Sequence, residues 1–147
     1  MKKGTLKAVE NYINAFGEDA LKKILVQEVN ETNDKVLTII ANEGIHHIPE
    51  KYILGKKFVA SSDKLNFDSE AKLKSQIKNI LKRTSRVLKQ EKWNKIYLIP
   101  TGHPVLYMQI KLLIFRITRL ESTDIIYSSD GRYYEIELDQ REIINQV

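Results

Sequence analysis

The chain has 147 residues, of which 42% are hydrophobic and 29% charged, and its formal net charge is +5. This balance is typical of a folded protein and this length is typical of one domain, so we expect a single α/β domain over residues 1–147. The sequence contains no cysteine, which excludes disulfides, zinc–thiolate sites and cysteine nucleophiles.

Membrane segments are not predicted. No apolar stretch follows the lysines at positions 2 and 3, as it would in a signal peptide. The apolar run 105–115 is interrupted by Lys111 and is too short to span a bilayer. We therefore expect a cytoplasmic protein without a membrane partner.

The N-terminal portion, residues 1–55, predicts helices and one strand. Apolar residues at helical spacing indicate a first helix that ends near Phe16, whereas residues 18–29 fit a helix or a strand. The β-rich apolar run 36–41 predicts a buried strand. The segment 45–57 that follows is expected to be irregular or to form a short helix.

Residues 56–139 predict the core of the fold. The helix after strand 58–60 has its apolar residues on one stripe. Helix 104–118 is apolar on nearly every side, so we expect it to be enclosed by other elements or to lie in a subunit interface. In chain order the elements are strand 58–60, a helix capped by Asp68 or Ser69, strand 96–99, helix 104–118 and strand 125–128. This alternation is typical of a parallel sheet with right-handed crossovers.

A hairpin is predicted at the C-terminal edge of the sheet. Asp130 and Gly131 lie between two β-rich runs, a common hairpin signal. The second run, 132–138, alternates as a half-exposed antiparallel edge strand does. The predicted fold class is therefore α/β: a Rossmann-like, mostly parallel sheet with flanking helices and a C-terminal antiparallel hairpin at its edge.

The loop after strand 96–99 is the first candidate for a ligand site. Pro100 ends the strand and Pro104 suits the first turn of the next helix, whose N-terminus favours an anion. Between them, Gly102 lets a ligand approach the backbone and Thr101 offers a hydroxyl to a phosphate or a sugar. His103 can act as a general base, contact the ligand or simply cap the helix.

The ends of the other predicted strands add further candidates, because ligands of open parallel sheets bind past the carboxyl ends of the strands. Small polar residues follow three strands there, and the hairpin adds an aromatic ring that can stack on a base and a cation that can contact a phosphate. These candidates are Asn42, Gly44, Ser61, Ser62, Tyr127 and Arg132. The same residue types also form ordinary turns, pack in a core or are solvated, so both interpretations stay open.

Several known signatures are absent from the sequence. It has neither GxGxxG nor GxxxxGK[ST], so we expect no dinucleotide cofactor and no P-loop. The three histidines are His46, His47 and His103, and their spacing matches no metal-binding motif, so no metal site is predicted. A catalytic residue is not identified; His103 is the candidate if there is one.

One segment of the chain is strongly basic. Residues 72–95 hold nine lysines and arginines and one acid, which leaves 15 basic and 18 acidic residues elsewhere. Such a segment is either a solvated helix face or a surface for an anionic partner. If the partner is a long nucleic acid, we expect Lys78, Lys82 and Arg86 to contact it.

Residues 56–139 resemble the Rossmann-like cores of CARF and SAVED domains, the cyclic-oligonucleotide sensors of prokaryotic antiviral systems. The resemblance rests on a helix that ends near Lys92 and Trp93, on the strand-loop-helix 96–104, and on the following strand with its tyrosine-bearing hairpin. It implies that Thr101, Gly102 and His103 hold a phosphate or base of the ligand. Because the chain has room for half of a pseudo-duplicated SAVED domain, it also implies a homodimer or a partner effector chain.

Three functions follow as hypotheses. The first is a nucleotide-binding module that recognises a phosphate-bearing, cyclic oligonucleotide in antiviral signalling or counter-defence. The second is a small phosphodiesterase, similar to a ring nuclease, in which a histidine at 46, 47 or 103 acts as acid or base. The third is a nucleic-acid or protein-interaction domain that uses the basic helix over residues 72–92.

Overall fold

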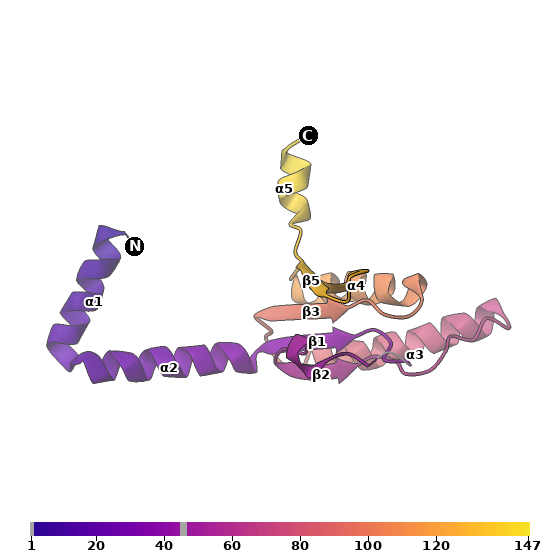
Figure 1. Cartoon of the computed structure of the whole chain (residues 1–147), viewed down its shortest axis with the longest axis horizontal. Helices are drawn as coiled ribbons and strands as arrows, with labels where there is room; N and C mark the ends of the chain where they lie inside the picture. Colours follow the sequence, from indigo (N-terminus) through magenta and orange to yellow (C-terminus); the bar gives the residue numbers. More distant parts are fainter. Residues whose placement is uncertain (1, 45–46) are drawn as a thin grey trace. The chain divides into compact units, whose positions relative to one another are not determined.

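The chain folds as two units, Met1–Asp34 and Lys35–Val147, in a computed structural model that describes residues 2–44 and 47–147 but not the side chains of 29–34 (Figure 1). The first unit consists of the helices α1 (Lys3–Phe16) and α2 (Glu18–Asp34). Gly17 separates them, with a positive φ of 86° and its N–H bonded to the Ile13 carbonyl oxygen at 2.8 Å. The segment 18–29, which fits a helix or a strand by its sequence, is therefore helical.

The second unit is built on a five-stranded sheet in the order β2-β1-β3-β4-β5. The first four strands are parallel and the last is antiparallel to β4. Their bounds are β1 (Val36–Ile40), β2 (Lys56–Val59), β3 (Lys95–Ile99), β4 (Thr123–Tyr127) and β5 (Tyr133–Ile136). The predicted fold class, a mostly parallel α/β sheet with an antiparallel hairpin at its edge, is confirmed.

Strand β1 lies between β2 and β3, a position that the chain order does not reveal. Ile39 is opposite Phe58 on one side and Leu98 on the other, so β1 is paired along both edges. The helix α3 (Glu70–Leu88) thus crosses over β1 to connect β2 with β3. Its N-cap is Ser69, whose hydroxyl accepts a hydrogen bond from the Lys72 N–H at 3.1 Å, so of the two predicted caps Ser69 is the right one.

The two faces of the sheet are covered differently. Helices α3 and α4 (Pro104–Thr118) pack on one face, where Leu37, Ile39, Ile96 and Leu98 of the sheet meet Ile80, Leu88, Leu106, Ile110 and Ile114. The connection from β1 to β2, with the short helix η1 (Glu50–Tyr52), covers the other face over Ile40, Ile99 and Ile125. Right-handed crossovers explain this difference, because the chain moves one way from β1 to β2 and the opposite way afterwards.

Helix α4 is buried on its sheet side and partly open on the other. Met108 and Leu112 remain 58% and 52% exposed, so elements of this chain do not enclose them. The alternative expectation for this helix, a subunit interface, stays a prediction. The one lysine in its apolar run, Lys111, contacts Asp124 at 2.7 Å between Nζ and Oδ2, which ties α4 to β4.

The C-terminal helix α5 (Gln140–Asn145) was not expected from the sequence. Asp139 caps it, since its side chain accepts a hydrogen bond from the Arg141 N–H at 2.9 Å.

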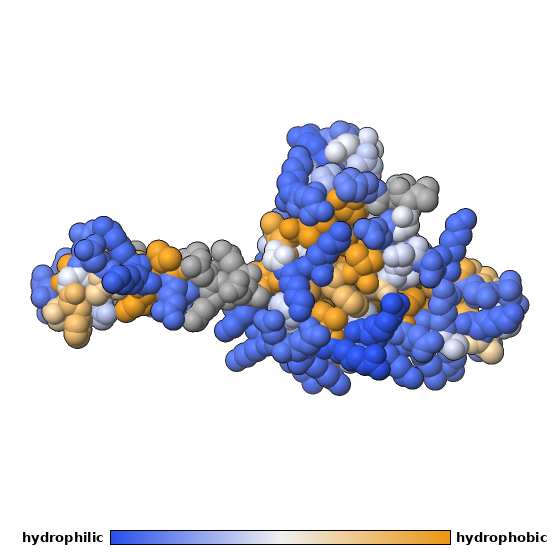
Figure 2. Space-filling view, turned by 90° about the horizontal axis from the view of Figure 1, so that it is seen from below, coloured by the Kyte–Doolittle hydropathy of each residue, from blue (hydrophilic) through white to orange (hydrophobic). Residues whose placement is uncertain are grey.

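Hydrophilic residues cover most of the surface of the second unit on the side shown in Figure 2, with hydrophobic residues exposed between them. Within the described residues, no helix is both long and apolar enough to cross a membrane.

Gly55 should be the least replaceable glycine of the core. Its φ is positive, and an added Cβ would overlap the backbone carbonyl of Val36. We expect Gly55→Ala to lower the free energy of unfolding by more than the roughly 1–2 kcal/mol that a left-handed backbone costs an L-residue. Urea denaturation measures this change.

The matched control is Gly131→Ala. Gly131 also has a positive φ, but the atom nearest to its added Cβ is the Tyr127 hydroxyl oxygen at 4.0 Å. This variant should therefore show the backbone cost alone. Equal losses in the two variants would contradict the close approach of Gly55 to β1.

Candidate functional site

The strand order of the sheet reverses at the carboxyl ends of β1 and β3. The chain leaves β1 toward one edge of the sheet and leaves β3 toward the other. These neighbouring strands continue into connections that cover opposite faces of the sheet. In open α/β sheets ligands bind at such a point, past the carboxyl ends of the strands. The loops that border it, 41–44 and 100–103, contain several of the predicted site residues.

A reciprocal pair of hydrogen bonds joins the two loops. The Thr101 hydroxyl donates to the Asn42 carbonyl oxygen at 2.5 Å and accepts from the Asn42 N–H at 3.2 Å. Gly102 follows with a φ of 87°, and a Cβ there would lie 2.7 Å from the Cβ of Asn42. A glycine is needed at this position because the loops are so close. The Thr101 hydroxyl is thus engaged within the chain, and its first role is to brace the two loops against each other.

The loop after β2 is tied to the same brace. The Asn42 side-chain Nδ2 donates to the Asp63 carbonyl oxygen at 2.8 Å, and the Glu43 N–H donates to that of Ser61 at 2.9 Å. Ser61 itself is buried, and its hydroxyl is 3.4 Å from the Asp63 carbonyl oxygen. The structure therefore brings Asn42, Ser61 and Thr101 together, through bonds that they make to the chain itself.

A cavity of about 640 Å³ opens beside this brace, at the carboxyl edge of β3 and β4. Ile99 and Ile125 line it, and Thr101 and Pro100 border it from the loop. Three tyrosines and one histidine complete much of its wall: Tyr107, Tyr127, Tyr133 and His47. Among the described residues, no lysine, arginine or carboxylate lines the cavity. It is therefore an aromatic cavity with few polar groups.

The tyrosines of the hairpin are held by ring contacts. Tyr133 packs edge-on against Tyr127 with ring centroids 5.2 Å apart, and against Tyr52 of η1 at 4.5 Å. Tyr127 and Tyr133 are also directly opposite each other in the antiparallel register of β4 and β5. Tyr127 is still 62% exposed, so its ring is available at the mouth of the cavity.

His103 lies outside the cavity and caps α4. Its Nδ1 accepts a hydrogen bond from the Val105 N–H at 3.1 Å, and its ring contacts Phe67 with centroids 5.1 Å apart. Pro104 occupies the first turn of α4 as expected. Of the two other histidines, His47 lines the cavity, whereas His46 lies outside the described residues.

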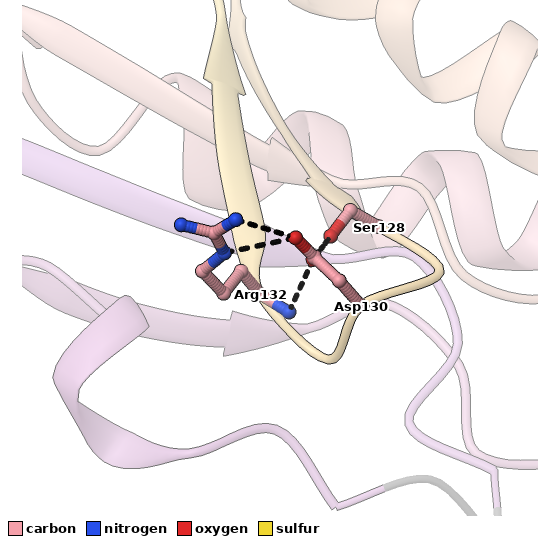
Figure 3. A network of polar contacts seen from close by, with 3 residues as sticks. All are labelled: Ser128, Asp130 and Arg132. Carbon is pink, nitrogen blue, oxygen red and sulfur yellow. Dashed lines mark hydrogen bonds and ion pairs between the residues drawn. The ribbon is translucent and has the colours of Figure 1, made fainter.

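Arg132 is bound within the hairpin turn rather than directed at the cavity (Figure 3). Its guanidinium donates to Asp130 Oδ2 from Nη2 at 2.6 Å and from Nε at 3.0 Å, and Ser128 donates to the Oδ1 of the same carboxylate. These bonds lower the pKa of Asp130 from 3.8 to about 2, and the bond from Arg132 has the largest effect. The charge of Arg132 is therefore neutralised locally.

The remaining candidates are at the surface. Gly44 and Ser62 are exposed and do not line the cavity. Tyr107 was not singled out from the sequence, although its position three residues after Pro104 places it in the first turn of α4. No group of three or more His, Asp or Glu side chains suited to a metal occurs among the residues that the structure describes.

Comparisons with known proteins find no match to this chain among family models, curated proteins or solved structures. The fold and the cavity define its class: an α/β protein with a mostly parallel five-stranded sheet and an aromatic cavity at the carboxyl edge of that sheet. Of the resemblance to CARF and SAVED cores over 56–139, the α/β architecture is the part that the structure supports.

Removing the Thr101 hydroxyl should loosen the brace between the two loops. Thr101→Val keeps the shape of the side chain but leaves the Asn42 N–H and carbonyl without this partner. We expect the free energy of unfolding to fall by about 1–3 kcal/mol, the net value of two hydrogen bonds. Thr101→Ser keeps the hydroxyl and should lose less. Urea denaturation of both variants checks this, and a loss in Thr101→Ser as large as that in Thr101→Val, or larger, would contradict the leading role of the hydroxyl.

The pKa of Asp130 offers a test of the hairpin. Because this pKa is lowered from 3.8 to about 2 in the folded chain, the stabilising contribution is present above pH 3.8 and is lost as the pH falls toward 2. An NMR titration of the Asp130 carboxyl should show a midpoint near 2. In Arg132→Gln the midpoint should move back toward 3.8. An unchanged midpoint in that variant would mean that Arg132 is not the cause.

Proposed function

We propose that the chain is a nucleotide-binding module whose aromatic cavity takes the base of a phosphate-bearing nucleotide. The observation that carries this proposal is the gathering of Tyr107, Tyr127 and Tyr133 around one cavity at the carboxyl edge of a parallel sheet. This is the edge at which open α/β folds bind their ligands. At about 640 Å³, the cavity is within the usual size range of small-molecule sites.

The chemistry of the wall suits a planar heterocycle. Aromatic side chains stack on nucleobases, and each such contact is worth about 1–3 kcal/mol. Tyr127, at the mouth of the cavity, is the best placed ring for stacking, and Ile99 and Ile125 supply apolar surface beneath it. The tyrosine hydroxyls and His47 offer hydrogen bonds to the edge of the base.

The phosphate of the ligand would lie toward His47 and the first turn of α4. The cavity has no lysine or arginine among its described lining residues, so His47 is the one basic side chain among them. The N-terminus of α4 adds a partial positive charge next to Thr101 and Gly102. In this proposal Thr101 and Gly102 keep the loop in place beside the cavity.

The narrower form of the proposal is that the nucleotide is one unit of a cyclic oligonucleotide in antiviral signalling or counter-defence. It is suggested by the resemblance of residues 56–139 to CARF and SAVED cores. In that case a second copy of the chain, or a partner effector chain, completes the site. An open cavity at the edge of the sheet is compatible with such sharing.

The phosphodiesterase alternative rests on His47, because His47 lines the cavity and His103 does not. His103 also has its Nδ1 engaged by the Val105 N–H. If the protein cleaves its ligand, His47→Ala should abolish product formation and His103→Ala should retain most of it. Binding without product in the unsubstituted protein supports the binding module.

A calorimetric titration with mononucleotides and with linear and cyclic oligonucleotides tests the proposal. Tyr127→Ala should weaken the binding of the best ligand about tenfold or more, since a stacked base contributes roughly 1–3 kcal/mol and about 1.4 kcal/mol is a factor of ten. The measurement is the dissociation constant, with product analysis of the same samples by chromatography.

The matched control is Tyr134→Ala. Tyr134 lies on the same hairpin and is 46% exposed, but alternation along β5 places it on the opposite face from Tyr133, and it does not line the cavity. Its variant should bind as the unsubstituted protein does. Absence of binding to every nucleotide, or an equal loss in the Tyr134 variant, would overturn the proposal.

A further inference from the structure

The outer surface of the helical layer carries a second feature, away from the aromatic cavity. A shallow groove of about 520 Å³ runs between α3 and α4. Lys78, Lys82 and Arg86 of α3 line it, together with Leu81, Ser85 and Leu113. We call these six residues the basic groove, and we propose that it binds the phosphate backbone of a nucleic acid.

The three cations of the basic groove form one row. They are four residues apart on α3, so successive side chains lie on the same side of the helix and rise about 6 Å from one to the next. All three are exposed. A row of this kind presents positive charge along a line, which matches the linear charge of a phosphodiester backbone.

No acid balances this charge. Residues 71–90 contain seven lysines and arginines and no aspartate or glutamate. Within the part of the chain that the structure describes, Lys78, Lys82 and Arg86 have no carboxylate within ion-pair distance, whereas Lys72 pairs with Asp68 at 3.8 Å. Solvated helices usually gain from opposite charges at this spacing, and like charges there destabilise the helix. An anionic partner removes that repulsion.

The other groups of the groove fit a sugar–phosphate chain. The guanidinium of Arg86 can hold a phosphate with two parallel hydrogen bonds, and the Ser85 hydroxyl is a neutral donor of the kind that contacts phosphate oxygens. Leu81 of α3 and Leu113 of α4 line the same groove and supply its apolar surface. Exposed Arg116 is three residues after Leu113 on α4, so the positive surface extends onto the second helix.

A nucleic acid fits these observations better than a membrane surface does. Helices that lie on membranes insert an apolar face into the lipid. The apolar face of α3 is already buried against the sheet through Ile80 and Leu88. The exposed side of α3 borders the basic groove, which is shallow and has cations at its margin. A groove of this kind suits one strand of a sugar–phosphate backbone.

Fluorescence anisotropy with a labelled RNA of about 20 nucleotides and with a duplex DNA of the same length, at several salt concentrations, tests the proposal. The triple variant Lys78→Ala, Lys82→Ala and Arg86→Ala should bind at least tenfold more weakly. For each phosphate that the variant no longer neutralises, the slope of log affinity against log salt should fall by about 0.9 on the duplex and about 0.7 on the single strand. Alanine is a strong helix former, and circular dichroism verifies that the variant is folded.

Two controls make the result specific. Lys3→Ala, Lys7→Ala and Lys23→Ala remove the same charge from α1 and α2 and should leave the affinity within about twofold. The groove variant should also bind mononucleotides as the unsubstituted protein does, because the cavity is lined by other residues. This keeps the outcome separate from that of the proposed nucleotide site.

Three results would overturn the inference. One is an unchanged affinity and salt slope in the groove variant. Another is an equal loss in the control that lacks the lysines of α1 and α2. The third is a groove-dependent binding to vesicles of phosphatidylserine without any binding to nucleic acid, which would assign the surface to anionic lipid.

Discussion

The pairing of β1 with β3 is the interaction on which the second unit depends. It inserts the first strand between the two that α3 connects, so each side of β1 is hydrogen bonded and Leu37, Ile39 and Ile40 are fully buried. It also sets the direction of every later connection. Because crossovers are right-handed, α3 and α4 cover one face and the segment with η1 covers the other. The loops after β1 and β3 therefore begin side by side and lead to opposite faces of the sheet.

The polar groups of these two loops are used first to hold the loops together. The Thr101 hydroxyl donates to the Asn42 carbonyl oxygen and accepts from the Asn42 N–H, and Gly102 permits the close approach of the two loops. The recognition chemistry that we propose lies beside them, in an aromatic cavity. The row of cations that lines the basic groove lies elsewhere, on the outer side of α3. The two proposals thereby assign base recognition and backbone recognition to different surfaces, so separate variants test them.

Much of the second unit could be predicted from local patterns. The strands at 36–41 and 96–99, the helix after Pro104 and the hairpin at Asp130–Gly131 have strong signals, and the structure has each of them. The lining of the cavity could be predicted only in part. Thr101 and Tyr127 were singled out because they lie at the ends of predicted strands, but His47 lies in a connection whose path depends on the faces of the sheet. Arg132 was expected at a phosphate, which stays a prediction; in the structure its guanidinium binds the carboxylate two residues away.

The sequence by itself determined the α/β class, the antiparallel edge and the basic character of α3, because these depend on periodicity, turn chemistry and charge within one segment. The tertiary structure decided the strand order, the two differently covered faces, and which side chains meet at the cavity. Those properties arise from pairings between segments that are far apart in the chain. Thr101 and Asn42 are 59 residues apart, and no local pattern specifies the two bonds that join them.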